Sequence, residues 1–274
     1  MSSVKSAGAI SNLRNVPRQK SSRKSSKIPL RPRKIRRVTN DGKSSKTTPS
    51  ESPATPPRIV SRSLSCEGEI ELAIQHLRSA DPRLTDLIDT HRRPAFDSSH
   101  PPFLALSKSI IYQQLASRAA TSIYTRFVSL CGGELNVLPH IVLALSPQEL
   151  RQIGVSGRKS SYLHDLASKY QEGFLSDSSI VEMDDDSLFA KLTIVNGIGP
   201  WSVHMFMIFT LQRPDVLPAS DLGVRKGVQL LHGLEKPPRP NQMEELCEKW
   251  RPYRSVASWY MWRLVEGKGI LNVE

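Results

Sequence analysis

The sequence predicts an all-α protein preceded by a basic tail, and three observations support this. From about Ser65 onward, apolar residues recur at the three- and four-residue spacing of amphipathic helices. The alternation of apolar and polar residues that marks strands is nearly absent from the same region. Residues 1–65 differ in character, because they are rich in Ser, Lys, Arg and Pro. We therefore expect a disordered tail at residues 1–65 and a domain of some eight helices at residues 66–274.

The tail carries the net positive charge of the chain. Residues 1–65 contain 16 Lys and Arg residues against Asp41 and Glu51, a net charge of +14, whereas the remainder has a net charge of −2. The segment has no aromatic residue, so it cannot bury enough apolar surface to offset the entropy cost of ordering. Residues 31–37, RPRKIRR, are typical of a nuclear import signal or a DNA-scanning arm. The alternatives are a chloroplast or mitochondrial transit peptide and a solvated tail without a fixed partner.

Start signals place several of the helices. Ser146 and Glu149, three residues apart, form a capping-box pattern in which each side chain accepts a free backbone N–H of the first turn. The run Asp184–Asp186 puts negative charge where a helix dipole favours it. Ser65 is expected to cap the first helix. The expected helices cover residues 65–77, 103–130 after two prolines, a helix that starts at 147, then 158–170, a helix that starts within 184–186 and runs to 195, 200–211, 241–250 and 255–265.

Several function classes find no support in the sequence. Cys66, Cys131 and Cys247 are far apart, which argues against a disulfide framework, a zinc site or an iron–sulfur cluster. The seven histidines form no HxxxH pair or other metal-ligand spacing. No apolar run approaches the roughly 20 residues of a membrane span. We therefore expect no metal, no cofactor and no membrane partner.

The most informative segment is the turn Asn196-Gly197-Ile198-Gly199, followed by Pro200. Glycines allow positive φ and a close approach of the backbone to another surface, and Ile198 can anchor the turn in the core. Proline suits the first position of the helix that follows. Free N–H groups at that helix start are shaped for a phosphate. The alternative is a tight helix–helix turn without a ligand.

Downstream of this hairpin, the loop from Arg213 to Asp221, RPDVLPASD, leads into another helix. This order of hairpin, helix, proline-containing loop and Asp resembles the helix-hairpin-helix/GPD superfamily of DNA base-excision glycosylases. Within it, the chain is similar to the 3-methyladenine DNA glycosylase II branch in its bacterial and fungal forms. The resemblance covers about residues 81–266. It also includes residues 110–116 (IIYQQLA), 157–159 (GRK) with Tyr162, and 250–254 (WRPYR) with Trp259 and Trp262.

The resemblance implies a fold, a partner and a set of site residues. It implies a two-lobed helical bundle that acts, as a monomer, on double-stranded DNA with damaged bases. Asp221 matches the family's catalytic carboxylate, which stabilises positive charge on the sugar, although Asp221 also stands where a helix cap would stand. The expected substrate pocket comprises Trp201, Met205, Trp250 and Tyr253. The expected DNA-binding residues are Gln114, Leu115, Arg158, Lys159, Asn196, Gly197, Ile198, Gly199 and Arg254.

Two of these assignments carry explicit alternatives. Leu115 matches the family's wedge, the side chain that fills the gap left by a flipped base, but it also continues an apolar stripe and so fits core packing. Met205 stands where the bacterial relative has a second pocket aromatic, which leaves the substrate range open. Trp259 and Trp262, three residues apart, are expected to be packing aromatics.

The expected reaction is hydrolysis without strand cleavage. Family members that resemble endonuclease III carry a Lys nucleophile shortly after the hairpin glycines, and here that position is Trp201. A purine methylated at N3 or N7 is already cationic, so it leaves without a strong general acid and attracts an aromatic face. The alternatives are a glycosylase for another lesion, such as uracil or oxidised guanine, and a non-catalytic damage-binding module of the same fold.

Overall fold

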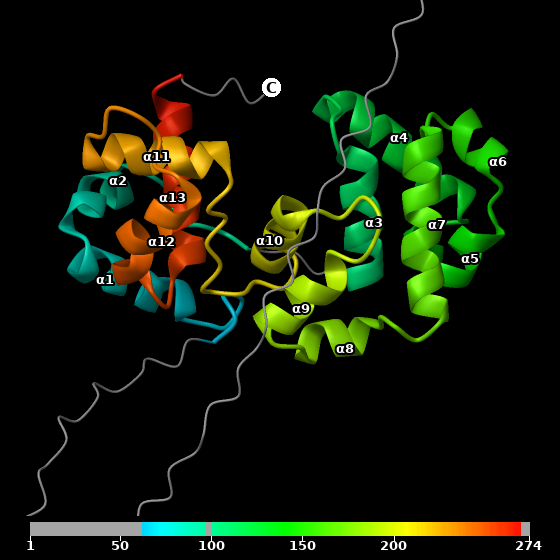
Figure 1. Cartoon of the computed structure of the whole chain (residues 1–274), viewed down its shortest axis with the longest axis horizontal. Coiled ribbons are helices and arrows are strands. Elements are labelled where there is room, and N and C mark those ends of the chain that lie inside the picture. Colours follow the sequence, from blue (N-terminus) through cyan, green and yellow to red (C-terminus); the bar gives the residue numbers. More distant parts are fainter. Residues whose placement is uncertain (1–61, 97–99, 270–274) are drawn as a thin grey trace, which may run out of the picture. The chain divides into compact units, whose positions relative to one another are not determined.

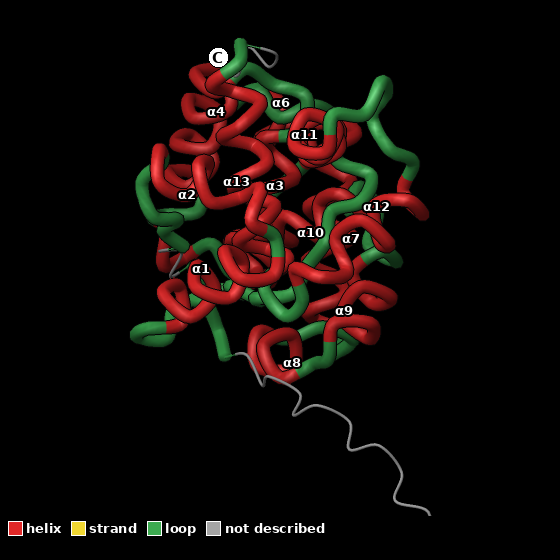
Figure 2. Tube along the Cα trace, turned by 90° about the vertical axis from the view of Figure 1, so that its left-hand side faces the viewer, coloured by secondary structure: helices red, strands yellow, loops and turns green. Residues whose placement is uncertain are grey.

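The computed structural model describes residues 62–96 and 100–269, all within one structural unit, Thr55–Glu274. Across these residues it contains only helices and loops, without a strand (Figure 2). The all-α prediction is therefore confirmed. The α-helices are α1 (Glu69–Ala80), α2 (Thr85–Thr90), α3 (Pro102–Tyr112), α4 (Ser117–Leu130), α5 (Pro139–Ala144), α6 (Pro147–Gln152), α7 (Gly157–Gln171), α8 (Asp177–Glu182), α9 (Asp185–Leu192), α10 (Pro200–Phe209), α11 (Leu222–His232), α12 (Pro240–Cys247) and α13 (Arg254–Gly267).

The helices form two groups (Figure 1), and the chain passes from the first group to the second and back to the first. In the first, α13 packs on α1, α2 and most extensively on α11. That packing is close at Gly227, where an added Cβ would lie 2.6 Å from the Met261 Cβ. In the second, α7 packs on α3, α5 and α6. Helix α10 contacts α3 and α9, and the chain then returns to the first group through residues 210–221.

The sequence signals for helix starts are partly confirmed. Ser146 and Glu149 form both hydrogen bonds of the capping box, and the Asp184 side chain caps α9 through the Ser187 N–H. Ser65 is not a cap: α1 begins at Glu69, after Gly68 in the left-handed conformation at φ 77°. Helices of six residues such as α2, α5 and α8 were not predicted, because six residues show less than two turns of periodicity.

The expected long helix over residues 103–130 is two helices. The chain leaves helical geometry at Gln113, with ψ 131°, and Gln114 adopts a left-handed φ of 55°. Residues 113–116 therefore form a turn between α3 and α4, which we call the wedge turn; Gln113 is half-buried and the other three residues are exposed. The apolar stripe that joined these helices in the sequence is interrupted here, so the prediction of a continuous helix is wrong.

The expected tail falls almost wholly outside the described residues. Its last four residues, 62–65, belong to the folded unit: Leu64 is buried and its N–H donates to the Gln212 carbonyl at 2.9 Å. Leu64 therefore contacts the helical domain directly before the predicted boundary at residue 65. In the described part of the chain, no helix is long and apolar enough to cross a membrane.

Candidate active site

The hairpin, residues Asn196–Gly199, connects α9 to α10 and is shaped by its glycines. Gly197 has φ 84°, and a Cβ added there would lie 2.1 Å from the Tyr162 ring. Only glycine fits this position, since both the backbone conformation and the close approach exclude a side chain. Ile198 is buried at 4% exposure and anchors the turn, as expected. Gly199 precedes Pro200, the first residue of α10, so that helix presents its N-terminus at the hairpin.

Two residues, one from α7 and one from the wedge turn, hold the hairpin backbone. The Asn196 N–H donates to the Asp165 Oδ2 at 2.7 Å, and the Gln113 side-chain amide donates to the Gly197 carbonyl at 2.8 Å. Burial favours the neutral form of Asp165, but hydrogen bonds from Lys169 and the Asn196 N–H outweigh it and lower the pKa of this carboxyl. The Asn196 N–H is thus bound within the protein, so a phosphate would have to meet other N–H groups of the hairpin and of α10.

Asp221 is the last residue before α11, and both of its carboxylate oxygens are held. Oδ1 accepts the Val224 N–H at 2.8 Å and the Trp262 indole N–H at 2.9 Å. Oδ2 accepts the Trp201 indole N–H at 2.7 Å. The residue is half-buried. Asp221 is therefore a helix cap, but the two indole contacts orient the carboxylate in a way that a cap does not require.

Trp262 was expected to be a packing aromatic, and the structure gives it a polar role as well. Its indole lies against Asp221, and a Cβ added at Gly223 would lie 2.8 Å from the Trp262 Cδ1. The ring stacks on Phe209 with centroids 5.7 Å apart. No local signal reveals this contact, because 41 residues separate Trp262 from Asp221. Gly223, the second residue of α11, is the one hint in the sequence that another side chain lies close to this helix start.

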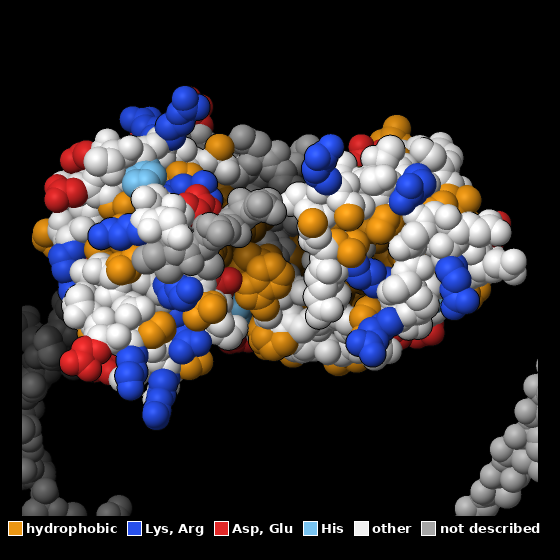
Figure 3. Space-filling view, turned by 90° about the horizontal axis from the view of Figure 1, so that it is seen from above, with side chains coloured by type: hydrophobic (Ala, Val, Ile, Leu, Met, Phe, Trp, Pro, Cys, Tyr) orange, Lys and Arg blue, Asp and Glu red, His pale blue; other side chains and the backbone are white. Residues whose placement is uncertain are grey.

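Trp201, Met205 and Phe209 lie four residues apart on α10 and so share one face of the helix. Trp201 is 50% exposed and Phe209 38%, whereas Met205 is half-buried. Trp201 thus combines an accessible aromatic surface with a hydrogen bond to Asp221. On the face of the molecule shown in Figure 3, hydrophobic side chains gather in the middle, and Lys and Arg side chains lie on either side.

Trp250 and Tyr253, also expected in the pocket, lie in the core. Both are almost fully buried. The Trp250 indole N–H donates to the Asp81 Oδ2 at 3.0 Å, and the Tyr253 hydroxyl donates to the Glu69 Oε1 at 3.0 Å. Burial, with the hydrogen bond to Glu69, raises the pKa of Tyr253 to about 12. Their polar atoms are satisfied by carboxylates at either end of α1, so neither ring offers a face to a base.

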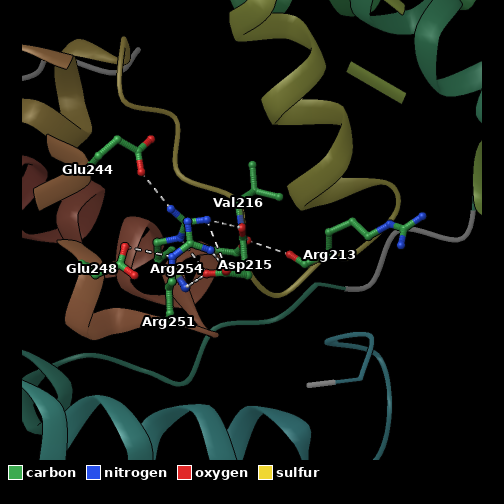
Figure 4. Close-up of polar contacts among 8 residues, drawn as sticks. Arg213, Asp215, Val216, Glu244, Glu248, Arg251 and Arg254 are labelled. Carbon is green, nitrogen blue, oxygen red and sulfur yellow. Dashed lines mark hydrogen bonds and ion pairs between the residues drawn. The ribbon is translucent and has the colours of Figure 1, made fainter. Parts of the chain in front are cut away.

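Arg254 was expected to bind DNA, and the structure assigns it to an internal ion network instead. It is 7% exposed. Its guanidinium donates to Asp215 Oδ1 at 2.7 Å and to Glu244 Oε2 at 3.0 Å, and Arg251 donates to Asp215 Oδ2 at 2.7 Å. Figure 4 shows both guanidinium groups converging on Asp215. Arg254 therefore ties α13 to α12 and to the loop after α10, and its donors are not directed at a phosphate.

The two basic residues at the start of α7 differ in their surroundings. Arg158 is exposed, as a phosphate contact requires. Lys159 instead donates from Nζ to the carbonyls of Ile111 and Gln113, each at 2.7 Å. Burial lowers the pKa of Lys159. Its ammonium is thus directed at the C-terminal end of α3, which corrects its assignment as a DNA-binding residue.

The wedge turn exposes two of the predicted DNA-binding residues, Gln114 and Leu115. Leu115 is 38% exposed and so is not part of the buried core, which argues against the core-packing alternative.

The described residues contain no group of three or more His, Cys, Asp or Glu that is placed to hold a metal ion. Two cysteines, Cys131 and Cys247, are buried. Burial raises the pKa of the Cys131 thiol to about 11 and that of the Cys247 thiol to about 12.

Comparison with known proteins identifies the family. Residues 107–252 match the HhH-GPD superfamily of base excision DNA repair proteins. The DNA-3-methyladenine glycosylase 1 of Schizosaccharomyces pombe is 32% identical over 192 residues, which cover 69% of this chain and 84% of that protein. The crystal structure of a DNA-3-methyladenine glycosidase from Bacillus halodurans superposes with a TM-score of 0.66 at 30% identity, covering 76% of this chain and 93% of the other.

A further solved structure includes DNA. The 3-methyladenine DNA glycosylase of Schizosaccharomyces pombe in complex with abasic DNA gives a TM-score of 0.62 at 30% identity, covering 71% of this chain and 97% of the other. The chain belongs to the HhH-GPD superfamily of base excision DNA repair proteins. Within this superfamily it is a DNA glycosylase of the 3-methyladenine glycosylase type.

Proposed function

We propose that this protein hydrolyses the N-glycosidic bond of alkylated purines in double-stranded DNA, of the 3-methyladenine and 7-methylguanine type. Water adds to the C1′ of the deoxyribose while the bond to the base breaks and its electron pair leaves with the base. The products are a free base, an abasic site and one proton. Support comes from the printed activities of the similar proteins and from the hydrogen bonds around Asp221.

The observation that carries the proposal is that, among residues 62–96 and 100–269, the donors that hold the Asp221 carboxylate are neutral. The contacts to its oxygens come from two indole N–H groups and one backbone N–H. These donors fix the orientation of the carboxylate without cancelling its negative charge. A flipped sugar that develops oxocarbenium character beside it would be stabilised by that charge, and such pre-organised groups contribute about 10²–10³-fold in rate. The same carboxylate can orient the attacking water.

The face of α10 supports selection of cationic purines. The exposed ring of Trp201 offers a π surface, and a flat cation is attracted to such a surface. Met205, one helical turn further, adds a polarizable and adaptable wall. A methylated purine that already carries positive charge leaves as a neutral base, so no additional general acid is required.

We infer that the enzyme is monofunctional. A lyase step needs an amine that forms an imine with the sugar. Trp201, the second residue of α10, occupies the position at which the resembling bifunctional enzymes carry Lys, and the Lys159 ammonium is engaged by α3. We further propose that the protein works as a monomer, inserts Leu115 on base flipping, and is directed to the nucleus by its basic tail.

The test is base release from DNA treated with a methylating agent. Chromatography should detect 3-methyladenine and 7-methylguanine, and the product strands should break only after alkali. Tight binding to methylated DNA without base release would instead indicate a damage-binding module. Release confined to uracil or oxidised guanine from the corresponding duplexes would indicate another lesion. Strand breaks without alkali, or borohydride trapping of a protein–DNA adduct, would contradict the monofunctional assignment.

A further inference from the structure

Lys159 closes the C-terminal end of α3. The last carbonyls of a helix lack partners within the helix, and the positively charged ammonium of Lys159 meets two of them, on Ile111 and Gln113, at 2.7 Å each. Lys159 is half-buried and its desolvation disfavours the charged form. A lysine that serves as a phosphate contact directs its ammonium outward to the DNA, whereas Lys159 directs it to two carbonyls of the protein, so these contacts indicate a different role.

Gln113 continues the connection to the hairpin. Its backbone carbonyl accepts the Lys159 ammonium, and its side-chain amide donates to the Gly197 carbonyl at 2.8 Å. Gln113 is also the first residue of the wedge turn, two residues before Leu115. Gln113 thus connects the wedge turn to the backbone of the hairpin.

Helix α7 supports both ends of this connection. Lys159 contacts the wedge turn, Tyr162 packs against Gly197, and Asp165 accepts the Asn196 N–H. Each of these residues lies three positions after the one before it, so successive members are neighbours on the helix surface. The wedge turn and the hairpin are therefore fixed to the same helix and to each other.

We propose that Lys159 and Gln113 are positioning residues that hold the wedge turn at a set distance from the hairpin, so that phosphate anchoring and wedge insertion occur at the same nucleotide. This inference rests on the proposed function. The hairpin fixes the backbone of the DNA, and the wedge must enter the stack where the damaged nucleotide leaves. A misplacement of about 1 Å in such an arrangement can cost about 10²-fold in rate.

The conformation of the wedge turn supports this role. Gln114 has φ 55°, which is uncommon for a residue with a side chain and persists where the surrounding contacts determine it. Lys159 and Gln113 provide such contacts directly before Gln114. Without them we expect the turn to relax, and Leu115 to lose its alignment with the hairpin.

The test compares Lys159→Met with Arg158→Met, two neighbouring cations on the same helix. Arg158→Met should weaken DNA binding and reduce the salt slope of log K by about one, as the loss of one phosphate contact does. Lys159→Met should leave the salt slope unchanged, but lower the single-turnover rate on saturating methylated duplex at least about tenfold. Fluorescence of 2-aminopurine opposite a stable abasic analogue should show reduced insertion in Lys159→Met.

The outcomes separate this inference from the proposed function. If the wild-type protein releases no methylated base, the proposed function fails. The 2-aminopurine signal still reports whether Lys159 and Gln113 position the wedge turn relative to the hairpin. Lys159→Met with the reduced salt slope of Arg158→Met would overturn the inference, and so would a lower melting temperature with an unchanged rate and signal. Gln113→Met removes the hydrogen bond to the Gly197 carbonyl without leaving a buried charge. The proposal requires reduced 2-aminopurine fluorescence in this variant too, and this result decides the matter if Lys159→Met does not fold.

Discussion

Two carboxylates six residues apart in the same segment, Asp215 and Asp221, have opposite surroundings. Asp215 is met by the guanidinium groups of Arg251 and Arg254, at 2.7 Å from each (Figure 4). Asp221 is met by two indoles and a backbone amide. Charged donors neutralise the first carboxylate, whereas neutral donors only orient the second.

The difference separates a structural acid from a candidate catalytic one. A carboxylate enclosed by Arg groups contributes to folding, and its charge is not available to a substrate. A carboxylate held by neutral dipoles keeps its full charge in a fixed position, which is what an oxocarbenium-like state requires. Proximity in the sequence therefore says little about role, and the type of donor around each acid says more.

Of the substitutions that test this contrast, Asp221→Asn should have the largest effect, a loss of base release. Asn keeps the size and the capping oxygen, but its amide nitrogen cannot accept the Trp201 N–H as Oδ2 does. Because Trp201 is 50% exposed and water can take its N–H, the melting temperature should still change little. Single-turnover base release should fall by at least about 10²-fold, because the charge is lost. DNA binding should persist, measured by fluorescence anisotropy. Loss of stability with base release retained per folded molecule would show that Asp221 is only a cap.

Asp215→Asn should give the reverse pattern. Two guanidinium groups lose their common counter-charge, and removing one partner of a largely buried pair is destabilising. We expect a loss of about 2 kcal/mol in the free energy of unfolding, below the range for fully buried pairs because Asp215 is partly exposed. Urea unfolding measures this loss. A large drop in base release by the folded variant at unchanged stability would contradict the structural role.

Asp81, a third carboxylate, is held by charged donors as Asp215 is, and it should make the free energy of unfolding depend on pH. Burial opposes its ionisation, but hydrogen bonds from Arg83, Lys249 and Trp250 outweigh it and lower the pKa to about 2. Because the folded pKa lies below the ordinary value, ionised Asp81 stabilises the fold above about pH 4, and this stabilisation is lost as the pH falls towards 2. The contribution is about 2 kcal/mol.

Asp81→Asn should therefore lower the free energy of unfolding at pH 7 and flatten its decline between pH 4 and pH 2. Urea titrations at pH 7, 4 and 2.5 would show both changes. An unchanged decline in the variant would remove Asp81 from the acid-sensitive groups. Base release per folded molecule at pH 7 should be retained, since Asp81 packs on Trp250 in the core.

Trp201→Phe should have the smallest effect. Phe keeps an aromatic face but loses the indole N–H that orients Asp221 Oδ2. A hydrogen bond to a charged group is worth about 1.5 kcal/mol or more, so the single-turnover rate should fall about tenfold. Trp201→Ala, which also loses the π surface, should fall further on cationic 7-methylguanine. Equal rates for the two variants would remove the ring face from substrate recognition.

The sequence predicted the parts of the molecule that depend on local patterns. The helical class, the Ser146 capping box and the Gly197–Gly199 hairpin all follow from neighbouring residues. The break at Gln113 was missed, because periodicity continues across a turn whose geometry is set by contacts with Lys159 on another helix.

The site was predicted less completely for the same reason. Trp250, Tyr253 and Arg254 have residue types that suit a DNA-binding pocket, and only their distant partners show that they serve the fold. Trp262 was assigned to packing, although it also donates to Asp221. A side chain's role depended on its partner, and partners distant in the sequence were not predictable from spacing.

The most direct test of the central claim measures whether Asp221 binds positive charge at the sugar. Affinity should be compared for duplexes carrying a neutral tetrahydrofuran abasic analogue and a cationic pyrrolidine analogue that mimics the oxocarbenium-like sugar. The wild-type protein and Asp215→Asn should both bind the cationic analogue more tightly, and Asp221→Asn should lose that preference. Retention of the full preference in folded Asp221→Asn would contradict the assignment of Asp221 as the group that stabilises the transition state.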